Sequence, residues 1–289
     1  MKIGLAMKDV SMSEVRTLAG AAEDAGLDAM LFPETGHVSG MNLGGRDPFL
    51  CASAALDVTT HLRAGPAIAA TTIRSARAMA VTAATIHEDS DGRFLLGCGV
   101  SHRPHVEALG LPYPDSVLRH ATAYVKELRD FSRDLVGYGR DVPIFLAALG
   151  PKMVALAAGA TDGTILNWLT VEGASQSVNR YGAAGGEGES FLLIRIGDEE
   201  SLRADAIAYR DQMPNYAAHF DAFGLDTIDD VVERTCLPSD VGAVAAGLRR
   251  YHEAGISVPC LYPSGLDQEQ ILELLVGLGD MMKSSGVSR

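Results

Sequence analysis

Positive charge is scarce in this chain. Its 289 residues include 24 Lys and Arg against 37 Asp and Glu, so the formal net charge is −13 at pH 7. Nucleic acid and anionic membrane surfaces would both repel so acidic a chain. We therefore expect neither of them as a partner.

Cysteines and long apolar runs are also few. The four cysteines, at positions 51, 98, 236 and 260, have neither metal-site spacing nor the pattern of a disulfide framework. No apolar run approaches the ~20 residues that a membrane-spanning helix needs. The chain begins Met1-Lys2-Ile3 and enters a predicted strand at once, which leaves no signal peptide. These features predict a soluble, cytoplasmic protein without a metal site.

Short apolar runs alternate with helical patterns along the whole chain. The first predicted helix opens with a capping-box pattern, Ser11 with Glu14, and closes at Gly26. Alternation of this kind is typical of a parallel sheet covered by helices. Eight strands predict an α/β fold of the (β/α)8 TIM-barrel type, whereas the alternative, a doubly wound open sheet, rarely needs so many. The predicted strands are residues 3–7, 29–32, 62–68, 94–100, 144–148, a sixth that ends at Asn167-Trp168, 191–196 and 258–262.

The length of the chain suits one barrel. A (β/α)8 barrel takes ~250 residues, and the excess falls in residues 101–116 and 198–257. The second segment holds three helical patterns and predicts an insertion between strands seven and eight. No low-complexity linker divides the chain, and the glycine-rich residues 183–188 are typical of a mobile loop. We therefore predict a single domain over residues 1–289.

Ligands of such barrels bind at the carboxyl ends of the strands, so the residues there are the site candidates. After the fifth strand, Gly150-Pro151 starts a helix whose free N–H groups suit a phosphate. Two neighbouring strands end in small residues, namely Ala67, Ala69, Ala70, Gly97 and Gly99. These residues either make room for a planar ring or only narrow the barrel. Together these features favour a cofactor with a planar head and a phosphorylated tail, although no dinucleotide-binding glycine motif follows a strand.

Each polar residue at the strand ends has two interpretations. Glu34 is a general acid or base, or a solvated loop carboxylate. His102 donates a proton or contacts a cofactor ring, while Asn167 binds that ring or caps a loop. Trp168, the single tryptophan, is core or pocket wall, and His37 is a surface or a pocket residue. Because no nucleophile elbow and no metal-ligand spacing occurs, an organic cofactor is favoured as the carrier of the chemistry.

Four blocks of the sequence form a specific set. They are residues 46–63 (RDPFLCASAALDVTTHLR), residues 65–68 with the helix from Arg77, residues 91–101 (DGRFLLGCGVS), and residues 147–168, which contain AALGPK and DGTILNW. The set resembles the luciferase-like monooxygenase superfamily, and within it the coenzyme F420-dependent oxidoreductases abundant in actinobacteria. The resemblance covers most of residues 1–170.

This resemblance implies a TIM barrel with an insertion, a deazaflavin at its carboxyl-terminal mouth, and a homodimer. In this family a bulge after the third strand backs the cofactor ring, often with a non-proline cis peptide, which here would be the Ala67-Ile68 bond. His37 and Trp168 are assigned to the substrate pocket. The combined set of cofactor contacts is Ala67, Ile68, Ala69, Cys98, Gly99, Val100, Ser101, Ala148, Leu149, Gly150, Pro151, Lys152 and Asn167.

We therefore expect an oxidoreductase that transfers a hydride between coenzyme F420 and a small-to-medium organic substrate. Glu34 or His102 would supply the proton. The sugar-phosphate dehydrogenases of the family carry an Asp-His pair where this chain has Pro33-Glu34-Thr35, and a Glu where it has Val100, which argues against sugar-phosphate oxidation. The alternatives are an FMN-dependent monooxygenase of the same fold and a cofactor-binding relative without catalysis.

Overall fold

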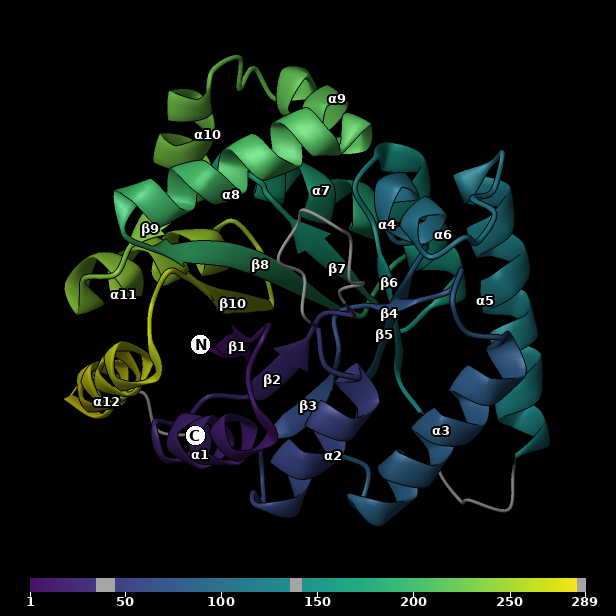
Figure 1. The fold of residues 1–289 in the computed structure, drawn as a ribbon, viewed down its shortest axis with the longest axis horizontal. Coiled ribbons are helices and arrows are strands. Elements are labelled where there is room, and N and C mark those ends of the chain that lie inside the picture. Colours follow the sequence, from purple (N-terminus) through teal and green to yellow (C-terminus); the bar gives the residue numbers. More distant parts are fainter. Residues whose placement is uncertain (35–44, 136–141, 285–289) are drawn as a thin grey trace.

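A parallel β-barrel forms the centre of the molecule (Figure 1). The computed structural model describes residues 1–34, 45–135 and 142–284. In the barrel the strand order is β3-β2-β1-β10-β8-β7-β6-β5-β4, and β9 pairs with β8. The strands are β1 (Gly4–Ala6), β2 (Ala29–Phe32), β3 (Arg63–Pro66), β4 (Ala69–Ala70), β5 (Leu96–Gly99), β6 (Ile144–Ala147), β7 (Gly163–Asn167), β8 (Glu189–Gly197), β9 (Leu237–Pro238) and β10 (Val258–Ser264).

Contacts between β3 and the residues before β5 close the barrel. Ala64 forms a parallel bridge with Phe94, and the backbone N–H of Leu95 donates to the carbonyl of Ala64 at 3.0 Å. The predicted TIM barrel is thus confirmed. The predicted third strand, however, divides into β3 and β4 around Ala67 and Ile68, whose peptide bond is cis.

Helices surround the barrel and cover its outer face (Figure 1). Each predicted helix is present, and the Ser11–Glu14 capping box opens the first of them. The predictions missed α4, α7 and α9. The helices are α1 (Met12–Asp24), α2 (Pro48–Asp57), α3 (Ala76–Asp89), α4 (Arg103–Ala108), α5 (Val117–Asp134), α6 (Pro151–Ala160), α7 (Val171–Ala183), α8 (Glu199–Gln212), α9 (Pro214–Ala222), α10 (Ile228–Thr235), α11 (Val241–Glu253) and α12 (Gln268–Ser284).

The inside of the barrel is packed with apolar side chains from alternate strand positions, among them Phe145, Ile165 and Phe191. Gly97 belongs to this packing. A Cβ at Gly97 would lie 2.1 Å from the carbonyl oxygen of Pro66 and 2.5 Å from Cδ1 of Ile165. The barrel therefore requires a glycine at this position because the neighbouring strand approaches so closely.

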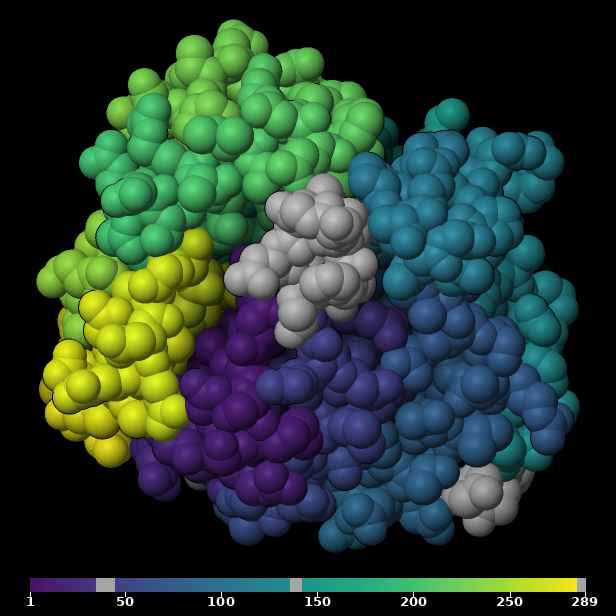
Figure 2. All heavy atoms as spheres, in the orientation of Figure 1, coloured from purple at the N-terminus to yellow at the C-terminus, as the bar shows by residue number. Residues whose placement is uncertain are grey.

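Between β8 and β10 the chain forms α8, α9, α10, β9 and α11. The first three helices pack around their own apolar cluster, which includes Leu202, Phe220 and Val231. In the space-filling view these green residues form one lobe along a side of the molecule (Figure 2). Among the described residues, no helix is both long and apolar enough to cross a membrane.

Candidate active site

A cavity of about 790 Å³ lies at the carboxyl ends of the strands. Its volume is within the range of ~300–1,000 Å³ that is typical of ligand sites. One wall consists of strand ends and the loops that follow them, and the other comes from α8 and α9. The lobe described above therefore builds half of the site.

The strand-end wall is flat because its side chains are small. Ala67, Ile68, Gly99 and Ala147 all line the cavity. A Cβ at Gly99 would come within 2.9 Å of the Ala147 Cβ and 3.2 Å of the Ile68 Cγ1. Gly99 thus keeps this apolar surface level, which suits the face of a planar ring.

The beginning of α6 forms the far end of the cavity. Gly150 is the N-cap of this helix, no side chain caps it, and both Gly150 and Pro151 line the cavity. Gln176 and Arg180, four residues apart on α7, line the same cavity, and α7 packs against α6. A helix N-terminus beside an arginine is well suited to bind an anion. The predictions missed Arg180 together with α7, the helix that carries it.

Glu34 lines the cavity, but both of its carboxylate oxygens already accept hydrogen bonds. Arg74 donates to Oε1 from Nε at 2.9 Å and from Nη2 at 2.6 Å, and the backbone N–H of Ala70 donates to Oε2 at 2.7 Å. Arg74 also pairs with Asp47 at 2.8 Å. Glu34 therefore ties the end of β2 to β4, beside the flat wall.

His102 lies at the start of α4 and faces the aromatic side of the cavity. Its ring centre is 5.4 Å from that of Tyr216 and 5.2 Å from that of His105. Burial, and then the charges of His105 and Arg195, lower the pKa of His102 to about 4. The imidazole is therefore neutral near pH 7, and it enters any reaction there as a neutral hydrogen-bonding group.

Arg195, near the carboxyl end of β8, is a buried cation beside this site. It is 2% exposed, and its guanidinium lies 4.1 Å from the ring centre of Trp168, 4.8 Å from that of Tyr209 and 4.6 Å from that of Tyr262. It also donates a hydrogen bond to Asn167. The predictions missed Arg195, although a charged residue inside the apolar run 191–197 was the available signal.

Two residues that follow the strand ends adopt the left-handed backbone conformation. Ser101, two residues beyond β5, has φ 67°, and Trp168, directly after β7, has φ 53°. Non-glycine residues adopt this conformation infrequently, and it is found disproportionately at functional sites. Both residues adjoin the site, Ser101 in the cavity lining and Trp168 behind it.

Most of the predicted site residues are brought together by the structure. Those that line the cavity are Glu34, His102, Ala67, Ile68, Gly99, Val100, Ser101, Ala148, Leu149, Gly150, Pro151 and Asn167. His37 lies outside the described residues.

Four predicted residues do not contribute to the lining. Ala69 and Cys98 are fully buried in the core between strands and helices, because successive strand side chains point to opposite faces. Lys152 is exposed on α6. Trp168 is 1% exposed and packs against the α8–α9 lobe behind Tyr209, so it supports the pocket wall from behind.

The fold and the cavity define a TIM-barrel protein with a ligand-sized cavity at the carboxyl ends of its strands. Residues 4–257 match the luciferase-like monooxygenase family, and the chain belongs to this family. It is 27% identical over 183 residues to the 5,10-methylenetetrahydromethanopterin reductase of Archaeoglobus fulgidus, which covers 58% of this chain and 53% of that protein. The chain thus spans about half the length of the curated relatives it matches.

Two solved structures share the fold over nearly the full length of both chains. An F420-dependent secondary alcohol dehydrogenase, in complex with an F420-acetone adduct, has a TM-score of 0.75 and 18% identity, covering 96% of this chain and 98% of that one. A monooxygenase from Streptomyces bottropensis has a TM-score of 0.71 and 17% identity, covering 99% of each chain. At such identities the likeness shows the fold alone. Within the described residues no group of three His, Cys, Asp or Glu side chains is placed to hold a metal ion.

Proposed function

We propose that this protein is an oxidoreductase that transfers a hydride between the deazaflavin coenzyme F420 and a small organic substrate. The observation that carries the proposal is the shape of one cavity, which joins a flat apolar wall at Gly99 to a helix N-terminus at Gly150. A planar head fits the wall, and a phosphorylated tail fits the helix start and Arg180. Relatives named as F420-dependent support the choice of cofactor.

The residues present fit such a cofactor. Ala67, Ile68 and Gly99 would lie against the ring, while Leu149, Gly150 and Pro151 would hold the phosphate, and Lys152 adds positive charge nearby. When bound, a deazaflavin supplies or accepts the hydride, because carbon replaces N5 of a flavin. The protein itself positions the two reactants, excludes water behind the α8–α9 wall and offers hydrogen-bond donors to the substrate.

Cofactor titration tests this proposal. F420 and FMN are titrated separately into the full chain by calorimetry, and we expect F420 to bind at least tenfold more tightly. Tighter binding of FMN would instead identify a flavin monooxygenase, the function of some proteins with this fold. Binding of neither would contradict both, and a protein that binds F420 without turnover on any organic substrate would be the non-catalytic relative.

The remaining parts of the proposal concern the surroundings of the enzyme. We infer a cytoplasmic homodimer that acts on a small molecule and binds neither nucleic acid nor membranes. The net charge of −13 supports the absence of polyanionic partners. Sedimentation analysis tests the dimer, and a monomer over the whole concentration range would contradict it.

A further inference from the structure

The side-chain amide of Asn167 has a fixed orientation. A guanidinium can only donate hydrogen bonds, so the atom of Asn167 that faces Nη1 of Arg195 is the oxygen, Oδ1. The amide nitrogen therefore faces the other way, and Nδ2 donates to Oη of Tyr216 at 2.7 Å. The donors point in sequence from Arg195 through Asn167 to Tyr216.

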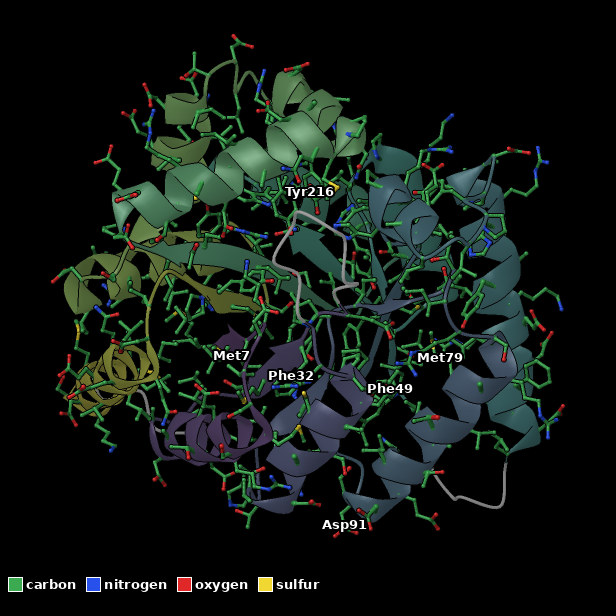
Figure 3. All side chains as sticks on the ribbon, viewed as in Figure 1. Met7, Phe32, Phe49, Met79, Asp91 and Tyr216 are labelled. Carbon is green, nitrogen blue, oxygen red and sulfur yellow. The ribbon has the colours of Figure 1, made fainter. Side chains whose placement is uncertain are left out.

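This arrangement leaves the hydroxyl proton of Tyr216 without an internal acceptor. Tyr216 Oη already accepts from Asn167, and in the described part of the chain no side chain or carbonyl accepts its proton. Tyr216 lines the cavity from α9, and Figure 3 shows it at the edge of the green lobe that faces the strands. Burial, and then the neighbouring Tyr209, raise the pKa of Tyr216 well above its usual value, so the group stays protonated.

The charge behind Tyr216 is unbalanced. No carboxylate among the described residues forms an ion pair with Arg195, and its Nε is buried without a hydrogen-bond partner. Asp205 is the carboxylate whose charge acts on Arg195 without a direct ion pair, and it is itself held by Lys8 at 3.6 Å and by the hydroxyl of Ser264 at 2.8 Å. A buried cation that lacks a carboxylate favours negative charge close by. The hydrogen bonds from Arg195 through Asn167 end at the Tyr216 hydroxyl, which lines the cavity. A negatively charged oxygen can bind there.

We propose that the Tyr216 hydroxyl binds the oxygen of a carbonyl substrate at its reacting carbon, with Asn167 and Arg195 as positioning residues. The proposal rests on the proposed function. With the reduced deazaflavin bound, a hydride would add to the carbonyl carbon, and the π electrons of the C=O bond would move to the oxygen. The oxygen would take the proton of Tyr216, and the proton that the deazaflavin releases on oxidation would return to Tyr216 through water, so the products would be an alcohol and the oxidised deazaflavin. A substrate with an isolated C=C bond has no oxygen that could accept a hydrogen bond from the Tyr216 hydroxyl, so the proposal excludes such substrates.

The test uses 4-nitrophenolate, a flat oxyanion whose absorption changes when its oxygen is hydrogen-bonded, on the full chain without cofactor. We expect Tyr216→Phe to weaken its binding at least tenfold, because only the hydroxyl is lost. The control is Tyr181→Phe, a buried tyrosine of α7 outside the cavity, for which binding stays within twofold. Equal affinity of Tyr216→Phe and the native chain, or no uptake by the native chain, would overturn the proposal.

A second variant tests the positioning role of Asn167. Asn167→Asp has two acceptor oxygens, so it would accept the Tyr216 proton and turn the donor away from the cavity. We expect a loss of 4-nitrophenolate binding as large as that of Tyr216→Phe, and no further loss when the two changes are combined. If the double variant instead lost the sum of the two binding free energies, the positioning role of Asn167 would be overturned. An Asn167 with a merely structural role would act independently of the Tyr216 hydroxyl.

The proposed function is tested separately on the same variants. Tyr216→Phe should bind F420 as the native chain does, and with ketones as substrates its kcat should fall at least a hundredfold. If the native chain binds 4-nitrophenolate through Tyr216 but binds no F420, the proposed function fails and the oxyanion site stands. If it binds F420 but Tyr216→Phe reduces ketones normally, the oxyanion site fails and the proposed function stands.

Discussion

Arg74 holds Glu34 by two of its nitrogens, and this pair fixes the end of β2 against β4. Nε and Nη2 of Arg74 lie 2.9 and 2.6 Å from one carboxylate oxygen of Glu34, while the other oxygen receives the N–H of Ala70. The backbone N–H of Glu34 also donates to the carbonyl of Ile68 at 3.1 Å. Glu34 therefore braces the segment that carries Ala67 and Ile68, the flat wall of the cavity.

Replacing Glu34 by Gln should for this reason weaken cofactor binding. The variant loses a charge-assisted pair, and hydrogen bonds to charged groups contribute about 1.5–3 kcal/mol each. We expect F420 affinity to fall about tenfold and the melting temperature to fall as well, measured by calorimetry and thermal denaturation. Glu107→Gln is the control, because its pair with Arg103 is half-exposed. Unchanged affinity with slow turnover would instead assign Glu34 the role of proton donor.

Gly150→Asp should change stability and binding in opposite directions. A Cβ at Gly150 meets nothing within 4 Å, and aspartate at an N-cap is more favourable than glycine by about a few tenths of a kcal/mol. The melting temperature should therefore stay or rise. F420 affinity should fall at least tenfold, because the carboxylate occupies the place of the phosphate and repels it. Gly150→Asn is the control, because asparagine has the shape of aspartate without its charge. Equal F420 affinity of the two variants would mean that the phosphate binds elsewhere.

Arg180→Gln tests the anion end of the cavity from the α7 side. We expect F420 affinity to fall about threefold to tenfold, and the salt dependence of binding to become weaker, because one screened attraction is removed. Calorimetry at low and high salt measures both quantities. Arg249→Gln on α11, an exposed arginine outside the cavity lining, is the control. Identical salt curves for the native chain and Arg180→Gln would exclude contact with the cofactor.

The barrel could be predicted because its signal is repeated and local. Each buried strand is a short apolar run, and each helix carries its own cap, such as Ser11 with Glu14. The helix α9 escaped prediction because Pro214, just after α8 ends, indicates the end of one helix rather than the start of another. Local patterns therefore predicted most of the strands and helices, but not the junction between α8 and α9.

The site could be predicted only in part, because closeness in space decides the rest. Strand ends converge in any barrel, so Gly99, Gly150 and Asn167 could be assigned to the mouth. Gly97 makes room inside the barrel, whereas Gly99 keeps the cavity wall level. This difference depends on which atoms of neighbouring strands approach each glycine, and a local sequence pattern does not contain that information. The burial of Trp168 likewise depends on the α8–α9 lobe, whose position follows from packing distant in sequence.

The lowered pKa of His102 predicts a loss of stability in acid. Its pKa falls from the ordinary 6.5 to about 4 on folding, so between these values the unfolded chain binds more protons than the folded one. Stability should therefore be complete above pH 6.5 and decrease as the pH falls toward 4, by up to about 3 kcal/mol from this group. His105, His120 and His219, whose pKa values burial also lowers, add to the same slope.

His102→Gln should remove the part of this pH dependence that comes from His102. Above pH 6.5 the substitution should not change how the unfolding free energy varies with pH. Urea unfolding at neutral and acidic pH measures it, and we expect the difference in unfolding free energy between the two conditions to be smaller in the variant than in the native chain. His61→Gln, at an exposed position before β3, should leave the slope as it is. Parallel pH curves for the native chain and His102→Gln would mean that folding does not lower the pKa of this imidazole, so that it would be partly protonated near its ordinary pKa of 6.5. It could then donate a proton at the cavity, as the sequence first suggested.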